Sequence, residues 1–129
     1  MTAPIALSCV TLDTADPPRL AEFYSELMGW KVMHSQPEYA LITDGRSVLC
    51  FGFAEGHVAA PWPDDPSNPK RVHFDLNVDD IDQASARATE LGATVPDFQP
   101  GLNPDWEGQQ PWGIVLDPEG HPICLNLRE

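Results

Sequence analysis

Basic residues and long apolar runs are both scarce in this chain. It carries 7 Lys and Arg against 20 Asp and Glu, which gives a formal net charge of −13. A surface this acidic repels polyphosphates, so nucleic acid and anionic membranes are excluded as expected partners. The short apolar start has no preceding basic residue, unlike a secretory signal, and no segment reaches the roughly 20 apolar residues of a membrane span.

Cysteine is also scarce, and several catalytic motifs are missing. The three cysteines, Cys9, Cys50 and Cys124, are odd in number and far apart. This favours free thiols in a reducing compartment over a disulfide framework, and we expect a cytoplasmic protein. The chain has no glycine-rich phosphate loop, no G-x-S-x-G elbow and no basic-aromatic stripe, which removes the corresponding function classes.

What the chain does contain is enough apolar sequence for one ordinary domain. It has 129 residues, of which 42% are hydrophobic. Many of its 14 prolines lie in two stretches, residues 61–69 and 96–111, and both should form surface loops. We therefore predict a single domain over residues 1–129, with one module at about 4–54, a proline-rich linker at about 55–70 and a second module at about 71–129.

The first module reads as strand, helix and three strands. Residues 5–12 predict a strand, and Asp16 with Pro17 then begins a helix that Gly29 ends. Apolar residues at three- and four-residue spacing give that helix one buried face. Three further strands are predicted at residues 30–34, 39–43 and 48–53, with a hairpin turn at Asp44-Gly45.

The second module repeats this order. A strand is predicted at 72–78, then a helix capped by Asp79 or Asp80 and ended by Gly92, then strands at 94–98, 114–117 and 122–127. Two copies of such a unit indicate an α+β fold of two βαβββ modules whose curved sheets form a cupped pocket. The alternative is that strand, cap and helix recur by chance, as they can in any α+β protein.

These motifs resemble the vicinal oxygen chelate superfamily, which includes glyoxalase I, bleomycin-resistance proteins and extradiol dioxygenases. The matching features are Asp16 through Phe23-Tyr24, Gly29-Trp30, His73-Phe74-Asp75 running into Val78-Asp79-Asp80, and Leu116-Asp117-Pro118-Glu119-Gly120-His121. The glyoxalase-like domain branch looks closest, because its last strand often carries a cysteine, as Ile123-Cys124-Leu125 does here. The resemblance covers nearly the whole chain and implies paired βαβββ modules.

Metal-dependent members of this superfamily hold a divalent cation with side chains from the first and last strand of each module. The resemblance implies a His seven residues before the first helix-capping Asp, where this chain has Cys9, and a Glu seven residues after Asp117, where it has Cys124. The equivalent position before Asp80 is His73, which fits. Residues 48–51 offer no carboxylate. Hard cations need oxygen or imidazole ligands, so we predict no metal cofactor and no ordinary dioxygenase or glyoxalase I chemistry.

A zinc site is the alternative to a metal-free one. Cys9, His73 and Cys124, with Cys50 as a fourth candidate, fall near the implied ligand positions. Three thiolates and an imidazole would suit tetrahedral Zn²⁺. Against zinc, the chain has no local chelating pair of cysteines, and a lone Cys on a strand commonly packs as a small apolar side chain.

His73 and Asp75 are the candidates for catalysis. They lie two residues apart on a predicted strand, so their side chains should share one face. Such a pair could move a proton or orient a ligand. Equally, His73 could be a hydrogen-bonded core residue, and the two could form a polar pair at the pocket mouth.

Aromatic residues complete the predicted pocket. We place Trp62, Trp106 and Trp112 in the proline-rich loops, where they need something to pack on. The alternation of Phe51 and Phe53 favours the core over ligand contact. His57 and His121 lie in predicted turns, and we expect both at the surface. The pocket prediction comprises Cys9, Phe51, Phe53, Trp62, His73, Asp75, Trp106, Trp112 and Cys124.

Three functions fit these observations, and whether the protein is an enzyme is left open. The first is binding of a small, mostly apolar molecule, neutral or cationic because of the acidic surface. The second is a metal-dependent lyase, isomerase or dioxygenase with an atypical Cys/His zinc site. The third is an interaction subunit whose cup is filled by its own side chains. The resemblance and the exposed sheet edges both favour a homodimer.

Overall fold

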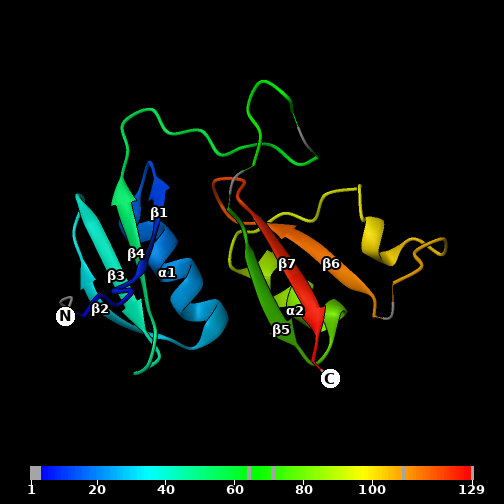
Figure 1. The fold of residues 1–129 in the computed structure, drawn as a ribbon, viewed down its shortest axis with the longest axis horizontal. Coiled ribbons are helices and arrows are strands. Elements are labelled where there is room, and N and C mark those ends of the chain that lie inside the picture. The colour runs from blue at the N-terminus through cyan, green and yellow to red at the C-terminus, as the bar shows by residue number, and fades with distance from the viewer. Residues whose placement is uncertain (1–3, 64, 71, 109, 129) are drawn as a thin grey trace. The chain divides into compact units, whose positions relative to one another are not determined.

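The computed structural model describes residues 4–63, 65–70, 72–108 and 110–128. It divides into two compact units, unit 1 (Met1–His57) and unit 2 (Val58–Glu129). Among the described residues each unit holds one β-sheet and one α-helix (Figure 1). The predicted α+β class and the repetition of one strand–helix pattern are therefore confirmed.

Unit 1 is a four-stranded sheet with a helix on one face. Its elements are β1 (Val10–Thr14), α1 (Pro17–Met28), β2 (Lys31–Ser35), β3 (Tyr39–Thr43) and β4 (Val48–Phe53). The sheet order is β1-β4-β3-β2, with β1 parallel to β4 and the other pairs antiparallel. The core lies between α1 and the sheet, where the ring of Tyr24 stacks on Phe51 with centroids 5.5 Å apart.

Helix α1 begins and ends where the sequence predicts. The Asp16 side chain accepts a hydrogen bond from the backbone N–H of Arg19 at 3.3 Å, and Pro17 occupies the first turn. Gly29 takes a left-handed conformation with φ of 73° and donates its N–H to Ser25 O at 2.8 Å. Glycine suits this position because a side chain would strain a backbone at positive φ.

Unit 2 repeats the arrangement with one strand fewer. Its elements are β5 (Phe74–Val78), α2 (Ile81–Glu90), a short 3₁₀ turn (Pro100–Leu102), β6 (Trp112–Leu116) and β7 (Pro122–Leu127). The sheet order is β5-β7-β6, with β5 parallel to β7 and β6 antiparallel to β7. Asp80, not Asp79, caps α2, accepting the N–H of Gln83 at 2.9 Å.

The strand predicted at residues 94–98 does not form. Only Thr94 pairs with Leu116, as an isolated bridge. The side chain of Gln99 instead hydrogen-bonds to the backbone of the edge strand β6. Its Oε1 accepts the N–H of Ile114 and its Nε2 donates to the carbonyl of Ile114, both at 2.8 Å. A side-chain amide carries the same donor and acceptor as a peptide group, so it can satisfy an edge strand without a paired strand.

Several strand boundaries also differ from the prediction, and β5 begins at Phe74, so His73 lies just before the strand instead of within it. The first strand begins at Val10, not residue 5, because its partner β4 pairs only with residues 10–14. Without that partner Ile5 and Leu7 stay 97% and 84% exposed. Trp112, predicted in a loop, is the first residue of β6.

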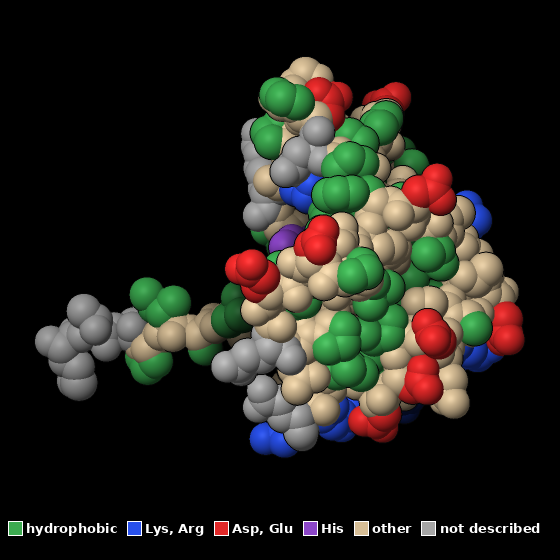
Figure 2. All heavy atoms as spheres, turned by 90° about the vertical axis from the view of Figure 1, so that its right-hand side faces the viewer, with side chains coloured by type: hydrophobic (Ala, Val, Ile, Leu, Met, Phe, Trp, Pro, Cys, Tyr) green, Lys and Arg blue, Asp and Glu red, His purple; other side chains and the backbone are tan. Residues whose placement is uncertain are grey.

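The surface carries many acidic side chains, as the net charge of −13 leads one to expect. Figure 2 shows acidic side chains dispersed over the face of unit 2 that it presents, together with a group of hydrophobic ones. Large apolar side chains exposed in the segment between α2 and β6 are Val95, Phe98, Leu102 and Trp106. Among the described residues, no helix combines the length and the apolar character that crossing a membrane requires.

The core position of Phe51 can be tested against its neighbour Phe53. Replacing the fully buried Phe51 by alanine should lower the free energy of unfolding by about 3–5 kcal/mol, because it leaves a cavity beneath α1. Phe53 is 54% exposed, and Phe53→Ala should cost less than about 1.5 kcal/mol. Urea unfolding followed by circular dichroism gives both values, and equal losses would contradict this assignment.

Candidate functional site

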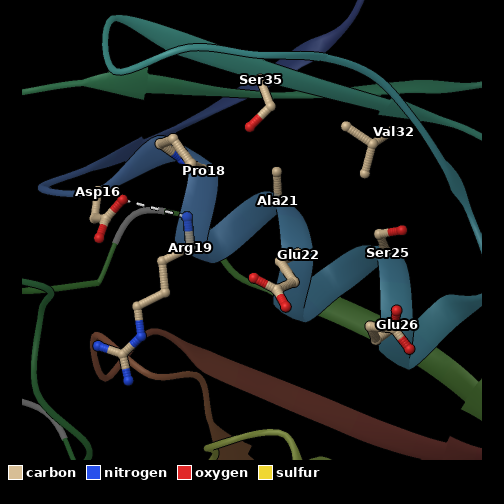
Figure 3. Close-up of a pocket in the computed structure, with 9 residues that line it drawn as sticks. All are labelled: Asp16, Pro18, Arg19, Ala21, Glu22, Ser25, Glu26, Val32 and Ser35. Carbon is tan, nitrogen blue, oxygen red and sulfur yellow. Dashed lines mark hydrogen bonds between the residues drawn. The ribbon is translucent and has the colours of Figure 1, made fainter.

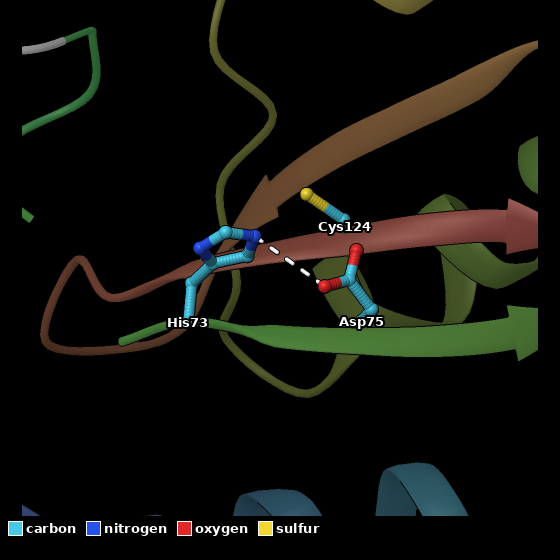
Figure 4. A group of neighbouring side chains, drawn as sticks. All are labelled: His73, Asp75 and Cys124. Carbon is cyan, nitrogen blue, oxygen red and sulfur yellow. Dashed lines mark ion pairs between the residues drawn. The ribbon is translucent and has the colours of Figure 1, made fainter. Parts of the chain in front are cut away.

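Three side chains with metal-binding and acid–base chemistry converge on the sheet of unit 2 (Figure 4). The parallel register sets Asp75 of β5 opposite Cys124 of β7, and His73 lies two residues before Asp75. His73 Nε2 is 3.4 Å from Asp75 Oδ2. One ligand atom from each of the three residues lies within 4.8 Å of the other two. The predicted His73–Asp75 pair and the predicted approach of Cys124 are both present.

Asn126 joins this group, and the sequence reading missed it. Its Nδ2 donates to Asp75 Oδ1 at 3.1 Å, so Asp75 meets His73 with one oxygen and Asn126 with the other. The side chains of His73 and Asp75 remain 41% and 56% exposed. The two-residue period from Cys124 to Asn126 was a signal available in the sequence, since residues i and i+2 of a strand share a face.

Cys124 is a thiol rather than a thiolate in this environment. Burial, followed by charge repulsion and hydrogen bonding from the neighbouring Asp75 carboxylate, raises the pKa of Cys124 to about 12. At neutral pH only about one molecule in 10⁵ would carry the thiolate. Without an added cation, Cys124 is therefore a hydrogen-bond donor and not a nucleophile.

The turn before β7 corrects the expectation that His121 lies at the surface. Asp117 is fully buried at its side chain, and its Oδ1 accepts the N–H of Glu119 and of His121 at 2.8 and 3.0 Å. His121 is not a surface residue: its side chain is 12% exposed, and its Nδ1 lies 2.8 Å from Asp117 Oδ2. Gly120, with φ of 98°, closes the turn.

Cys9 and Cys50, two further predicted zinc ligands, contact each other in unit 1. Cys9 precedes β1, and Cys50 lies in β4 opposite Thr11. Cys50 Sγ donates to Cys9 Sγ across 3.1 Å, and Cys9 Sγ also lies 3.7 Å from Thr11 Oγ1. Both cysteines are half-buried and free. The four predicted zinc ligands therefore occur as one Cys pair in unit 1 and one His–Cys pair in unit 2.

The predicted aromatic pocket residues take several roles. Phe51 is fully buried in the core of unit 1, against Tyr24, and does not line a pocket open to a ligand. Trp62 donates its Nε1–H to the Phe98 carbonyl at 2.9 Å, and Lys70 Nζ lies 4.9 Å from its ring centroid. Trp106 and Trp112 contact edge to face, with centroids 5.8 Å apart.

Two grooves among the described residues, one in each unit, lie away from the predicted pocket residues. One, of about 420 Å³, runs between α1 and β2 in unit 1, and its lining residues are shown in Figure 3: Asp16, Pro18, Arg19, Ala21, Glu22, Ser25, Glu26, Val32 and Ser35. The other, of about 320 Å³, is lined by residues 97–100 and 102–104 in unit 2. Neither includes any of the nine predicted residues.

The donor set in unit 2 fits zinc better than a hard cation. Tetrahedral Zn²⁺ with bonds of 2.0–2.3 Å separates its ligand atoms by roughly 3.5 Å, and the three ligand atoms here all lie within 4.8 Å of one another. Asp75 supplies the fixed anion that the predicted ligand set lacked. Mg²⁺ prefers an all-oxygen octahedron, whereas this group offers one carboxylate, one imidazole and one thiol.

Comparisons with known proteins place the chain within a family. The family model described as Glyoxalase-like domain matches residues 9–126. A search of the curated proteins found no match. Among solved structures, the chain is similar to a glyoxalase/bleomycin resistance protein/dioxygenase family enzyme from Burkholderia phytofirmans PsJN, with 19% identity, coverage of 93% of this chain and 96% of that one, and a TM-score of 0.66.

Two further solved structures share the fold. The genomically encoded fosfomycin resistance protein FosX from Listeria monocytogenes is 14% identical, with 98% of this chain and 96% of that one covered and a TM-score of 0.69. TioX from Micromonospora sp. ML1 is 21% identical, with 96% and 99% covered and a TM-score of 0.58. At these identities the likeness concerns the fold alone.

The environments of the cysteines predict an order of thiol reactivity. At about pH 7.5, iodoacetamide should modify Cys9 at least about tenfold faster than Cys124, because hydrogen bonds from Cys50 and Thr11 lower the pKa of Cys9 while burial raises that of Cys124. Raising the pH by one unit should speed Cys124 modification about tenfold. Timed quenching and peptide mass mapping measure each rate, with unfolded protein as the control. Cys124 reacting first would contradict the assignment.

Proposed function

The chain belongs to the glyoxalase-like domain family of the vicinal oxygen chelate superfamily, and we propose that it binds a small, mostly apolar molecule through the His73, Asp75, Cys124 and Asn126 face of unit 2. The observation that carries this proposal is the exposed pair His73–Asp75, held in position by Asn126. This pair is open to solvent, and so to a ligand, whereas the pair of His121 and Asp117 is covered.

This face combines hydrogen-bonding groups with apolar side chains, which suits an apolar ligand that carries one polar group. Asp75 presents acceptors for a cationic or hydroxylic group, and His73 can donate or accept. Residues of β6 on the same side of the sheet include Trp112 and Ile114, which pair with Asn126 and Cys124 in the register. An indole on the same face of the sheet as a carboxylate suits an apolar ligand that carries a positive charge.

The overall charge supports neutral or cationic ligands. At −13 the chain attracts cations over several ångströms and repels anions. We include a cytoplasmic homodimer in the proposal, since the three cysteines are free and the strands β1 and β5 lie at sheet edges, which a second copy could cover.

A matched pair of fluorescent titrations tests ligand binding. The apolar cation 9-aminoacridine should quench tryptophan fluorescence saturably, and the apolar anion 1-anilinonaphthalene-8-sulfonate should bind at least about tenfold more weakly. Asp75→Asn should weaken binding of the cation about tenfold or more, because it removes a charged contact. Asp82→Asn, on α2, makes the same change of charge and should have little effect.

Two outcomes would count against this site. Equal losses in Asp75→Asn and Asp82→Asn would mean that only the net charge attracts the probe. No saturable quenching by either probe would remove small-molecule binding as the function.

The second candidate is a metal-dependent lyase, isomerase or dioxygenase, and the convergence of three ligand atoms favours it. In that case His73, Asp75 and Cys124 would hold zinc, with Asn126 orienting the Asp75 carboxylate. Bound zinc would supply Lewis-acid chemistry toward adjacent substrate oxygens. The thiol ligand would disfavour hard cations such as Mg²⁺, and Cys124 would give up its proton on binding, since a coordinating thiol is deprotonated.

Metal analysis separates the two candidates. After growth with added zinc and dialysis, a zinc enzyme should retain close to one equivalent, and less than about 0.2 equivalents would end this candidate. Cys124→Ser and Asp75→Asn should each reduce zinc affinity at least about tenfold, because each removes a ligand. Asp82→Asn should retain zinc, and turnover should then depend on the metal.

A further inference from the structure

A second pair of reactive groups lies in unit 1, outside the face proposed for ligand binding. Thr11 is the register partner of Cys50, and Cys9 lies two residues before Thr11, so both thiols point to the same side of the sheet. Phe51 and Leu49, the neighbours of Cys50 in β4, are buried on the α1 side, so the thiols occupy the opposite side. Their sulfur atoms are 3.1 Å apart.

We propose that Cys9 and Cys50 form a redox-active dithiol that hydrogen peroxide converts to an intramolecular disulfide. The proposal rests on unit 1 alone and is independent of the function proposed for unit 2. It assigns a modification site to the chain and a chemical class, hydroperoxides, to its co-reactant.

The geometry needs only a small movement. A disulfide bond is about 2.05 Å long, so the two sulfur atoms must approach by roughly 1 Å. Cys9 lies before the first residue of β1. The chain that leads to it is exposed, with Ile5 at 97% and Leu7 at 84%. A segment with so few packing contacts can shift at low cost.

The two thiols are suited to different steps. Hydrogen bonds from Cys50 and then Thr11 lower the pKa of Cys9, which favours its thiolate. Burial raises the pKa of Cys50, and its hydrogen bond to Cys9 raises it further. The more acidic, half-buried Cys9 is the group to meet the peroxide, and Cys50 is the thiol that resolves the product.

The reaction balances with peroxide as the sole oxidant. The Cys9 thiolate attacks one peroxide oxygen, the O–O bond breaks, and the hydroxide that leaves takes a proton to form water. Cys9 is then a sulfenic acid. Cys50 attacks the Cys9 sulfur, the S–O bond breaks, and the departing hydroxide takes the Cys50 proton as a second water. Two thiols lose two electrons in all, and one peroxide becomes two waters.

Peptide mapping of the full chain tests the proposal directly. Reduced protein is treated with a small excess of hydrogen peroxide, quenched with N-ethylmaleimide under denaturing conditions and digested with trypsin. Arg19, Arg46 and Lys70 place the three cysteines in separate peptides. We expect a peptide pair linked through Cys9 and Cys50, an intact mass lower by two hydrogen atoms before labelling, and one remaining labelled thiol, Cys124. Dithiothreitol should restore all three thiols.

The three cysteines also supply matched variants. Cys124→Ser should form the linked peptide as the wild type does, whereas Cys9→Ser and Cys50→Ser should abolish it. Cys50→Ser should instead accumulate Cys9 sulfenic acid, trapped by dimedone. The proposal is overturned by a linked peptide that contains Cys124, by disulfides between chains only, by stable oxygen addition to Cys9 in the wild type without a link, or by three unmodified thiols. Because the wild-type digest is decisive alone, a variant that fails to fold does not obscure the result.

Discussion

The parallel pairing of the first strand with the last strand in each unit determines where its chemically active side chains meet. In unit 2, β5 and β7 run side by side in a register that sets Asp75 opposite Cys124. In unit 1, the pairing of β1 with β4 brings Cys9 to Cys50. A slip of one residue in either pairing would turn the side chains of one strand to the opposite face. The helix on the other face of each sheet opposes such a slip, because its core contacts require the present register.

Local surroundings give the three cysteines different chemistry. Hydrogen bonds lower the pKa of Cys9, while burial raises those of Cys50 and Cys124, with Asp75 adding to the effect at Cys124. Asp75 is the centre of the unit 2 group, since it contacts His73 and Asn126 and repels a negative charge on Cys124. The same carboxylate would attract a cation, whether a metal ion or the charged end of a ligand.

Family membership and site chemistry carry different information. The shared fold places side chains from the first and last strand of a unit together, and proteins of low identity share that arrangement. What happens there depends on the side chains themselves. Cys124 stands where metal-dependent relatives are expected to have a glutamate, and Asp75 provides a carboxylate from the strand beside it.

Local patterns in the sequence determined the elements of this protein, because caps, turns and periodicity act over a few residues. Asp16 with Gly29 bounded α1, strands 39–43, 48–53 and 122–127 matched, and the face shared by His73 and Asp75 followed from the strand period. Tertiary structure alone decided the rest. The strand expected at 94–98 gave way to the Gln99 amide, and Asn126 joined Asp75 across two neighbouring strands. Each of these outcomes depends on pairing between residues distant in the sequence or on a side chain replacing backbone, and neither leaves a local pattern.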